Sequence, residues 1–152
     1  MKKILILIYF LTVSVQAETL ELFWEDMIPK DYIAPQQQVS HDGSMVQQNL
    51  DAPVVRSLNG KVVKIPGFIV PLEGDNELTR EFLLVPYFGA CIHVPPPPPN
   101  QIVYVKFSGG VPIDNLYDAV WVTGTLSTDG WEGEIANVGY SLTGISVTPY
   151  DG

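Results

Sequence analysis

Hydrophobic and polar positions alternate in five short runs from residue 61 onward. In the fourth run, for example, Val120 and Val122 alternate with Trp121. A period of two is typical of β-strands, because successive side chains of a strand point to opposite faces of the sheet. The pattern therefore predicts five strands, at residues 61–72, 81–86, 102–107, 119–127 and 139–148.

Two of the predicted strands carry an irregularity. Pro66-Gly67 interrupts the first run, where proline removes one backbone donor and glycine allows the strand to coil sharply. We therefore expect residues 61–72 to form one strongly bent strand that pairs with more than one neighbour. In the last run, Leu142 and Ile145 differ in parity, so a bulge at or near Gly144 would restore one buried face.

Five strands with a bent first strand are typical of an OB-like barrel. A short turn or helix at 112–117, between the third and fourth strands, agrees with this arrangement. A small open sandwich is the alternative, but the seven strands of such a fold are not easily found here. The expected fold class is mainly β, a small five-stranded OB-like barrel with a short N-terminal helix.

The helix is predicted by apolar residues at helical spacing, namely Leu20, Phe23, Trp24, Met27 and Ile28. This spacing places one apolar stripe along a short amphipathic helix, which Pro29 ends. Periodicity is absent from 30 to 49, a stretch that we expect to be loop or linker. The chain is thus divided into an N-terminal helix and linker at 18–57 and a barrel domain at 58–152.

Residues 1–17 have the pattern of a secretory signal peptide. Lys2 and Lys3 precede the apolar stretch 4–13, and Val15-Gln16-Ala17 resembles a cleavage site. An apolar stretch of about ten residues is too short to cross ~30 Å of hydrocarbon as a helix, so a membrane anchor is the weaker alternative. We expect an exported, periplasmic protein with no membrane insertion after signal cleavage.

Acidic residues outnumber basic ones, and this narrows the range of partners. The 152-residue chain has 8 Lys and Arg against 17 Asp and Glu, a formal charge of −9. Residues 1–17 include two of the basic residues and no acids, so cleavage would leave −11. Nucleic-acid binding depends on Lys and Arg at the phosphates, so no nucleic-acid partner is expected.

A thiol and an imidazole stand two residues apart, at Cys91 and His93. Cys91 is the one cysteine of the chain, so no intrachain disulfide can form. In an extended segment both side chains would point to the same face with Cβ atoms ~6–7 Å apart, close enough to converge on one ion. Thiolate and imidazole suit zinc or copper(I), and two ligands are too few. Further ligands would come from Glu73, Asp75 or His41, or from a partner protein.

Five prolines at 95–99 follow this pair. Such a run adopts polyproline II, a stiff rod that would form a rim beside the thiol and imidazole with little entropy left to lose on binding. Three other readings of the region stay open. Cys91 could be a small buried hydrophobe, or His93 could activate it as the nucleophile of a thiol enzyme. In the third reading no metal is involved, and the rod forms a protein–protein contact surface with its aromatic neighbours Tyr87, Phe88 and Tyr104.

The run Gly-Ala-Cys-Ile-His-Val-Pro-Pro-Pro-Pro-Pro-Asn-Gln at 89–101, with the motifs at 65–73 and 81–85, resembles an uncharacterised bacterial family, domain of unknown function 3299. The likeness covers 58–150 and the opening at 24–29. The resemblance implies a small exported protein. Some relatives are encoded beside zinc-responsive transporter components, which favours a zinc-handling accessory role; Cys91 and His93 correspond to motif positions of the family.

We therefore expect a small periplasmic binding protein, a zinc-handling accessory to a transporter, with Cys91 and His93 as metal ligands. Its partner would be a metal transporter component or another periplasmic protein. The alternative from another class is a protein–protein interaction module without metal. A thiol enzyme ranks last, because no orienting Asn or Asp is placed by the sequence.

Overall fold

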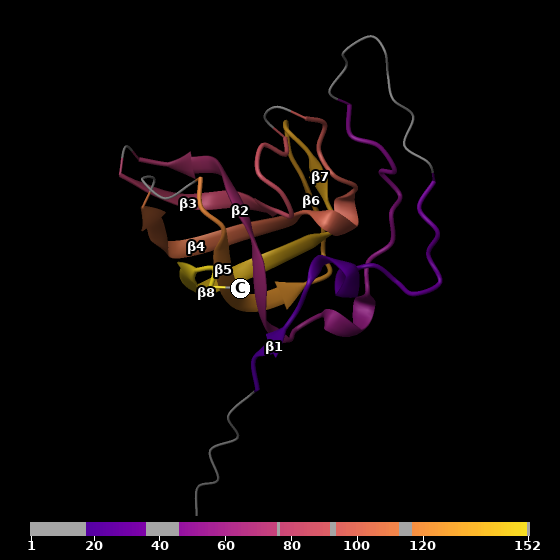
Figure 1. Ribbon diagram of the computed structural model, residues 1–152, viewed down its shortest axis with the longest axis horizontal. Helices are drawn as coiled ribbons and strands as arrows, with labels where there is room; N and C mark the ends of the chain where they lie inside the picture. The colour runs from indigo at the N-terminus through magenta and orange to yellow at the C-terminus, as the bar shows by residue number, and fades with distance from the viewer. Residues whose placement is uncertain (1–17, 36–45, 76, 92–93, 113–116, 152) are drawn as a thin grey trace, which may run out of the picture.

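A closed five-stranded barrel forms the body of the protein in the computed structural model, which describes residues 18–35, 46–75, 77–91, 94–112 and 117–151 (Figure 1). The two-residue strand β1 (Leu20–Glu21) is followed across the sheet by β2, β3, β4, β8 and β5, and a further β2–β5 pairing closes the ring. β4 and β8 are parallel, whereas the other barrel pairs are antiparallel. This confirms the predicted mainly β, OB-like barrel, whose strands are β2 (Val62–Gly74), β3 (Leu78–Val85), β4 (Val103–Pro112), β5 (Val120–Ser127) and β8 (Tyr140–Pro149).

The long strand β2 changes neighbours halfway along its length, as predicted. Its first part, from Val62 to Gly67, pairs with β5, and its second part, from Phe68 to Gly74, pairs with β3. At the change of neighbours, a Cβ atom on Gly67 would lie 2.6 Å from the carbonyl oxygen of Val85. The two backbones therefore approach more closely than any side-chain-bearing residue permits, and the barrel closes at this point.

The bulge predicted near Gly144 is present in β8. Gly144 pairs with Gly124 and Ser146 with Thr123, so Ile145 is left out of the ladder. Its side chain is 58 % exposed. The extra residue changes the parity of the strand, and Val147 returns to the interior side to pack against the core.

Apolar side chains form two layers, one inside the barrel and one outside it. Phe82 and Leu84 of β3 are buried in the barrel interior, whereas Leu83 and Val85 point outward and are also fully buried. The outer layer is covered by the segment around Ala90 and by a small hairpin that the sequence pattern did not predict. That hairpin consists of β6 (Trp131–Glu132) and β7 (Asn137–Val138).

The N-terminal segment differs from the amphipathic helix that we predicted. Leu20–Glu21 forms strand β1, which pairs in parallel with β2, and Trp24–Met27 forms a single 3-10 turn, η1. The turn is held by the Trp24 indole, whose Nε1 donates to the Pro66 carbonyl at 2.8 Å, and by burial of Met27. A short strand followed by a tight turn thus buries Met27 and half-buries Trp24, whereas Leu20 and Phe23 of the predicted apolar stripe stay exposed.

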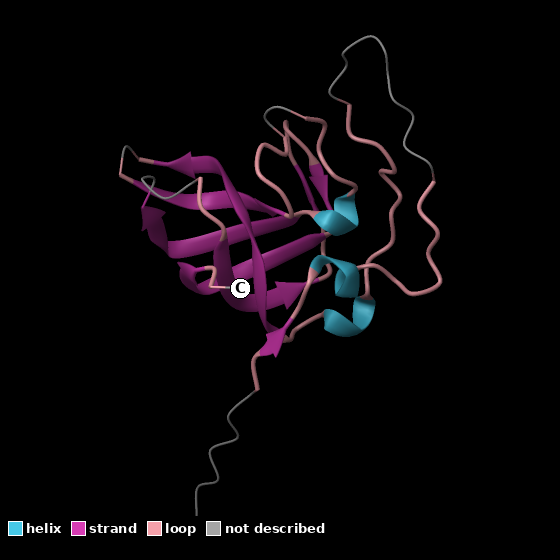
Figure 2. Cartoon of the chain, viewed as in Figure 1, coloured by secondary structure: helices cyan, strands magenta, loops and turns pink. Residues whose placement is uncertain are grey.

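Two further 3-10 helices, η2 (Arg56–Leu58) and η3 (Pro99–Gln101), lie on the same side of the barrel as η1 (Figure 2). Most of the turn or helix predicted at 112–117 falls at 113–116, outside the described residues. No helix in the described part of the chain is long and apolar enough to span a membrane.

Substitution Gly67→Ala should destabilise the barrel by about 1–3 kcal/mol, because the new methyl group forces the β2 and β3 backbones apart where β2 changes neighbours. Urea unfolding measures the loss. Ser57→Ala, at an exposed position of η2, serves as the control and should change stability by less than about 0.5 kcal/mol. A Gly67→Ala protein as stable as the control would show that the close approach does not constrain the fold.

Candidate functional site

Cys91 lies just after β3, beside the outer apolar layer. It is half-buried and packs against the cluster that includes Ala90 and Val85. Its φ angle of +65° is in the left-handed region, which residues other than glycine rarely adopt. Burial raises the pKa of the Cys91 thiol to about 11, so the group is protonated at neutral pH.

The structure describes two of the other four predicted metal ligands. His93 and His41 lie outside the described residues. Glu73 is near the end of β2, and Asp75 follows that strand in the turn to β3. Within the described residues, no three His, Cys, Asp or Glu side chains come together in a way that could hold a metal ion.

Asp75 organises the β2–β3 turn. Its Oδ1 accepts hydrogen bonds from the backbone N–H groups of Glu77 at 2.9 Å and Leu78 at 2.8 Å, and its Oδ2 accepts one from Arg80 at 2.9 Å. The Arg80 hydrogen bond, followed by the two backbone hydrogen bonds, lowers the pKa of Asp75 to about 2. This carboxylate is therefore already engaged in a turn.

The proline run packs against the protein instead of forming an exposed rim. Pro96, Pro97 and Pro99 are buried. The Pro97 carbonyl accepts a hydrogen bond from Gln47 and the Pro99 carbonyl accepts one from the Gly139 N–H, both at 2.7 Å. The run is therefore held against the chain by hydrogen bonds to its carbonyl groups, near Gln47 and the end of β7.

The aromatic neighbours of the proline run are divided between surface and interior. Tyr87 and Phe88 are 44 % and 53 % exposed. Tyr104, by contrast, is only 5 % exposed and belongs to the outer apolar layer. The protein–protein interaction hypothesis placed all three rings on one contact surface. Because Tyr104 is buried, only Tyr87 and Phe88 could belong to such a surface.

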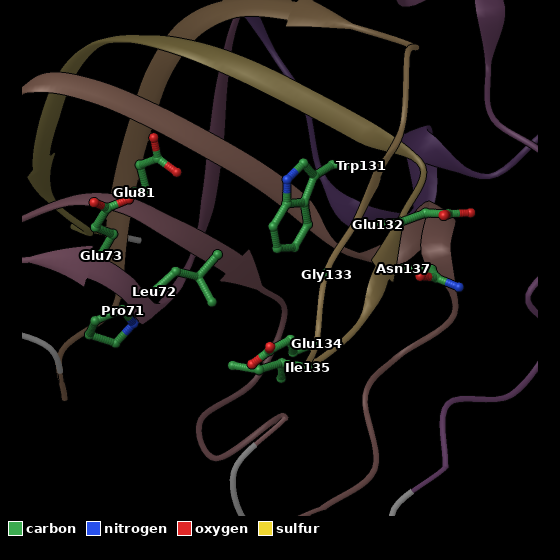
Figure 3. A pocket seen from close by; sticks show the side chains of 10 residues that line it. All are labelled: Pro71, Leu72, Glu73, Glu81, Trp131, Glu132, Gly133, Glu134, Ile135 and Asn137. Carbon is green, nitrogen blue, oxygen red and sulfur yellow. The ribbon is translucent and has the colours of Figure 1, made fainter.

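An open cleft of about 740 Å³ lies between the β2–β3 hairpin and the β6–β7 hairpin (Figure 3). Glu73 and Glu81 stand on the strand side of the cleft, and Glu134 stands at the tip of the small hairpin. The remaining lining side chains include an aromatic residue, three apolar residues, a further carboxylate and an amide, namely Trp131, Pro71, Leu72, Ile135, Glu132 and Asn137.

Trp131 fixes the small hairpin against the barrel. Its indole stacks on the Tyr104 ring with a centroid distance of 4.5 Å and an interplanar angle of 6°. A Cβ atom on Gly133 would lie 1.9 Å from the indole, so only glycine allows the ring to pack back against its own hairpin. The indole is thus held between Tyr104 and Gly133, and it forms one wall of the cleft.

Among the cleft carboxylates, Glu81 is the one whose negative charge is compensated by neighbouring groups. The Tyr104 hydroxyl donates to Glu81 Oε2, and Lys106 Nζ lies 3.3 Å from Oε1. The Tyr104 hydrogen bond and then the Lys106 contacts lower the pKa of Glu81. In the described part of the chain, Glu73, Glu132 and Glu134 have no ion-pair partner. The Glu132 side chain points away from Glu73 and Glu81 (Figure 3), so the uncompensated negative charge of the cleft comes from Glu73 and Glu134.

The sequence pattern missed this cleft because its two sides are far apart in the chain. Glu73 and Glu134 are separated by sixty residues, and the β6–β7 strands have two residues each, too few to show alternation. The one available signal is the segment Trp-Glu-Gly-Glu-Ile at 131–135, which combines an aromatic residue, two acids and a glycine.

Alkylation of Cys91 by iodoacetamide should be slow near pH 8 and should accelerate with a midpoint near pH 11, because only the thiolate reacts. The protein unfolded in guanidinium provides the control, since its exposed thiol has an ordinary pKa near 9 and reacts readily at pH 8. Equal rates for the folded and unfolded protein at pH 8 would contradict the raised pKa.

Comparison with known proteins identifies the family. Residues 24–149 match a family model described as a protein of unknown function, DUF3299. The crystal structure of a DUF3299 family protein from Pseudomonas aeruginosa PAO1 is 46 % identical in sequence, with a TM-score of 0.80, and the match covers 88 % of this chain and 97 % of that chain. No curated protein matches. This chain belongs to the DUF3299 family.

Proposed function

We propose that this protein is a small exported binding protein whose cleft between the β2–β3 and β6–β7 hairpins takes a lysine- or arginine-bearing segment of a partner protein. One observation carries the proposal: two carboxylates without an ion-pair partner in the described residues, of Glu73 and Glu134, stand on opposite sides of an open cleft of about 740 Å³ that also has apolar walls. Export is supported by the signal-peptide pattern of residues 1–17.

Size and chemistry together favour an organic cation. Lysine and arginine side chains combine a long apolar stem with a charged head. Leu72 and Ile135 offer apolar surface for such stems, while Glu73 and Glu134 offer carboxylates for the heads. The net charge of −9 adds long-range attraction for a basic partner.

The protein's own lysines provide two examples of the proposed contact. Lys106 Nζ lies 3.3 Å from Glu81 and 5.7 Å from the centre of the Tyr104 ring. Lys64 Nζ lies 4.0 Å from the centre of a Trp121 ring and 3.9 Å from the carboxylate of Glu21. At two places in this protein, an ammonium group thus lies beside both an aromatic ring and a carboxylate. The cleft offers the same combination of groups to a lysine of a partner.

A fluorescently labelled peptide of alternating lysine and leucine tests the proposal by fluorescence anisotropy. The wild-type protein should bind it with an affinity that falls as salt rises. The double variant Glu73→Gln, Glu134→Gln should bind about tenfold more weakly, since each rim ion pair is worth up to about 1 kcal/mol.

The matched control is Glu25→Gln, Asp31→Asn, which removes the same charge from exposed positions away from the cleft lining. This control should change the affinity by less than about twofold, because only long-range attraction is reduced. Equal losses in both double variants, or no binding by the wild-type protein, would rule out a specific cationic site in the cleft.

A second candidate function is zinc handling by Cys91 and His93, as accessory to a transporter. One observation favours it: Cys91 is held at φ +65°, and such conformations of residues other than glycine are concentrated at functional sites. Further ligands would come from Glu73, Asp75 or His41, or from a partner protein. Because zinc must displace the proton of a thiol with a pKa of about 11, binding would weaken steeply as pH falls.

Titration calorimetry with zinc distinguishes the second candidate from the first. If zinc binds at this pair, the purified protein takes up about one ion per chain, Cys91→Ser removes the binding, and Glu134→Gln leaves it intact. Circular dichroism of Cys91→Ser checks that the barrel is folded. No zinc uptake by the wild-type protein at pH 8 would exclude this candidate, whereas the peptide experiment would be unaffected.

A further inference from the structure

The geometry assigns Gln47 as the positioning residue of the cleft, an inference that rests on the function proposed above. Its Nε2 donates hydrogen bonds to the carbonyl oxygens of Pro97 and Asn137, each at 2.7 Å. Its Oε1 accepts a hydrogen bond from the Asn137 N–H, also at 2.7 Å. One side-chain amide therefore ties together three parts of the chain that lie up to 90 residues apart.

The two hydrogen bonds between the Gln47 amide and the Asn137 backbone are of the kind that a further strand beside β7 would form. Asn137 is the first residue of β7, and its N–H and C=O are both taken by the Gln47 amide, as an adjacent strand would take them. The β6–β7 hairpin has only two residue pairs, and a two-stranded hairpin of this kind is at best marginally stable alone. Gln47 therefore supplies part of the support that the hairpin lacks.

In addition to the burial of Ala136 and Val138 in the outer apolar layer, two contacts hold the strands of the hairpin beside the cleft. At β6 the Trp131 indole stacks on Tyr104, and at β7 the Gln47 amide holds Asn137. Glu132 and Asn137 are directly paired across the hairpin, and both line the cleft. Gln47 does not line the cleft itself, so its effect on the ligand acts through Asn137 and the Glu134 tip.

The segment that carries Gln47 is itself fixed to the barrel. Asn100 Nδ2 donates to the Pro53 carbonyl at 3.0 Å, and the Val55 N–H donates to the Tyr140 hydroxyl at 2.6 Å. The Tyr140 hydroxyl in turn donates to the Met27 carbonyl at 2.8 Å. The chain is therefore anchored to the barrel at Pro53 and Val55, a few residues after Gln47, which limits the movement of the segment that carries the amide.

Hydrogen exchange followed by NMR tests the role without any ligand. In Gln47→Leu, which removes all three bonds, exchange of the Asn137 amide should accelerate at least about tenfold, while the Val122 amide in β5 keeps its wild-type rate. Gln47→Glu keeps an acceptor for the Asn137 N–H but loses both donated bonds, and it should fall between the two. Asp51→Asn, at an exposed position of the same segment, should leave both amides unchanged.

The lysine–leucine peptide provides the second readout. Gln47→Leu should weaken its binding about three- to tenfold, and Asp51→Asn should not. If the wild-type protein does not bind the peptide, the proposed function fails while the exchange rates still decide whether Gln47 positions the hairpin. An unchanged Asn137 rate in Gln47→Leu, or an equal acceleration at Val122, would overturn the assignment, because the amide would then be either dispensable or a general stabiliser of the fold.

Discussion

The close approach of β2 to β3 at Gly67 is the constraint on which the rest of the structure depends. Because the absence of a side chain lets the backbone pass within contact of the Val85 carbonyl, one strand can serve two neighbours, β5 before this point and β3 after it. Because β2 pairs with both β3 and β5, the sheet closes on itself and has fewer free edges. The ring that results fixes where the outer faces of β3 and β4 lie, and those faces form the floor of everything built outside the barrel.

The outer layer distinguishes this barrel from a minimal one. Side chains such as Leu83 and Tyr104 would be exposed on a bare ring, but here they are buried together with residues of the segment around Ala90 and of the β6–β7 hairpin. Short segments with few backbone hydrogen bonds of their own can cover this surface because side-chain contacts hold them in place. Indole stacking and amide hydrogen bonds provide the contacts that longer strands would otherwise provide. The acidic cleft is the space left open at the edge of this cover.

Much of the barrel could be predicted from the sequence, because alternation is a local signal and each barrel strand has eight or more residues. The bend and the bulge could be predicted for the same reason, since Pro66-Gly67 and the parity change after Leu142 are visible within one strand. The prediction of an N-terminal helix was wrong, because apolar residues spaced by three and four positions also fit a strand followed by a 3-10 turn. The cleft and the burial of Cys91 depend on segments that meet only in the folded chain, while His93 and His41 lie outside the described residues.

The buried proline run has a consequence for how irregular backbone is tolerated beneath a protein surface. An ordinary residue brings one N–H donor and one carbonyl acceptor into the interior, and both need partners. Proline brings only the carbonyl, so Pro96 and Pro97 cross a buried region with half the usual polar demand. The carbonyls of Pro97 and Pro99 are met by Gln47 and Gly139, and no donor is left behind. Any other residue at these positions would bury an additional N–H group, so the repeat is a solution to a hydrogen-bonding problem as much as a source of stiffness.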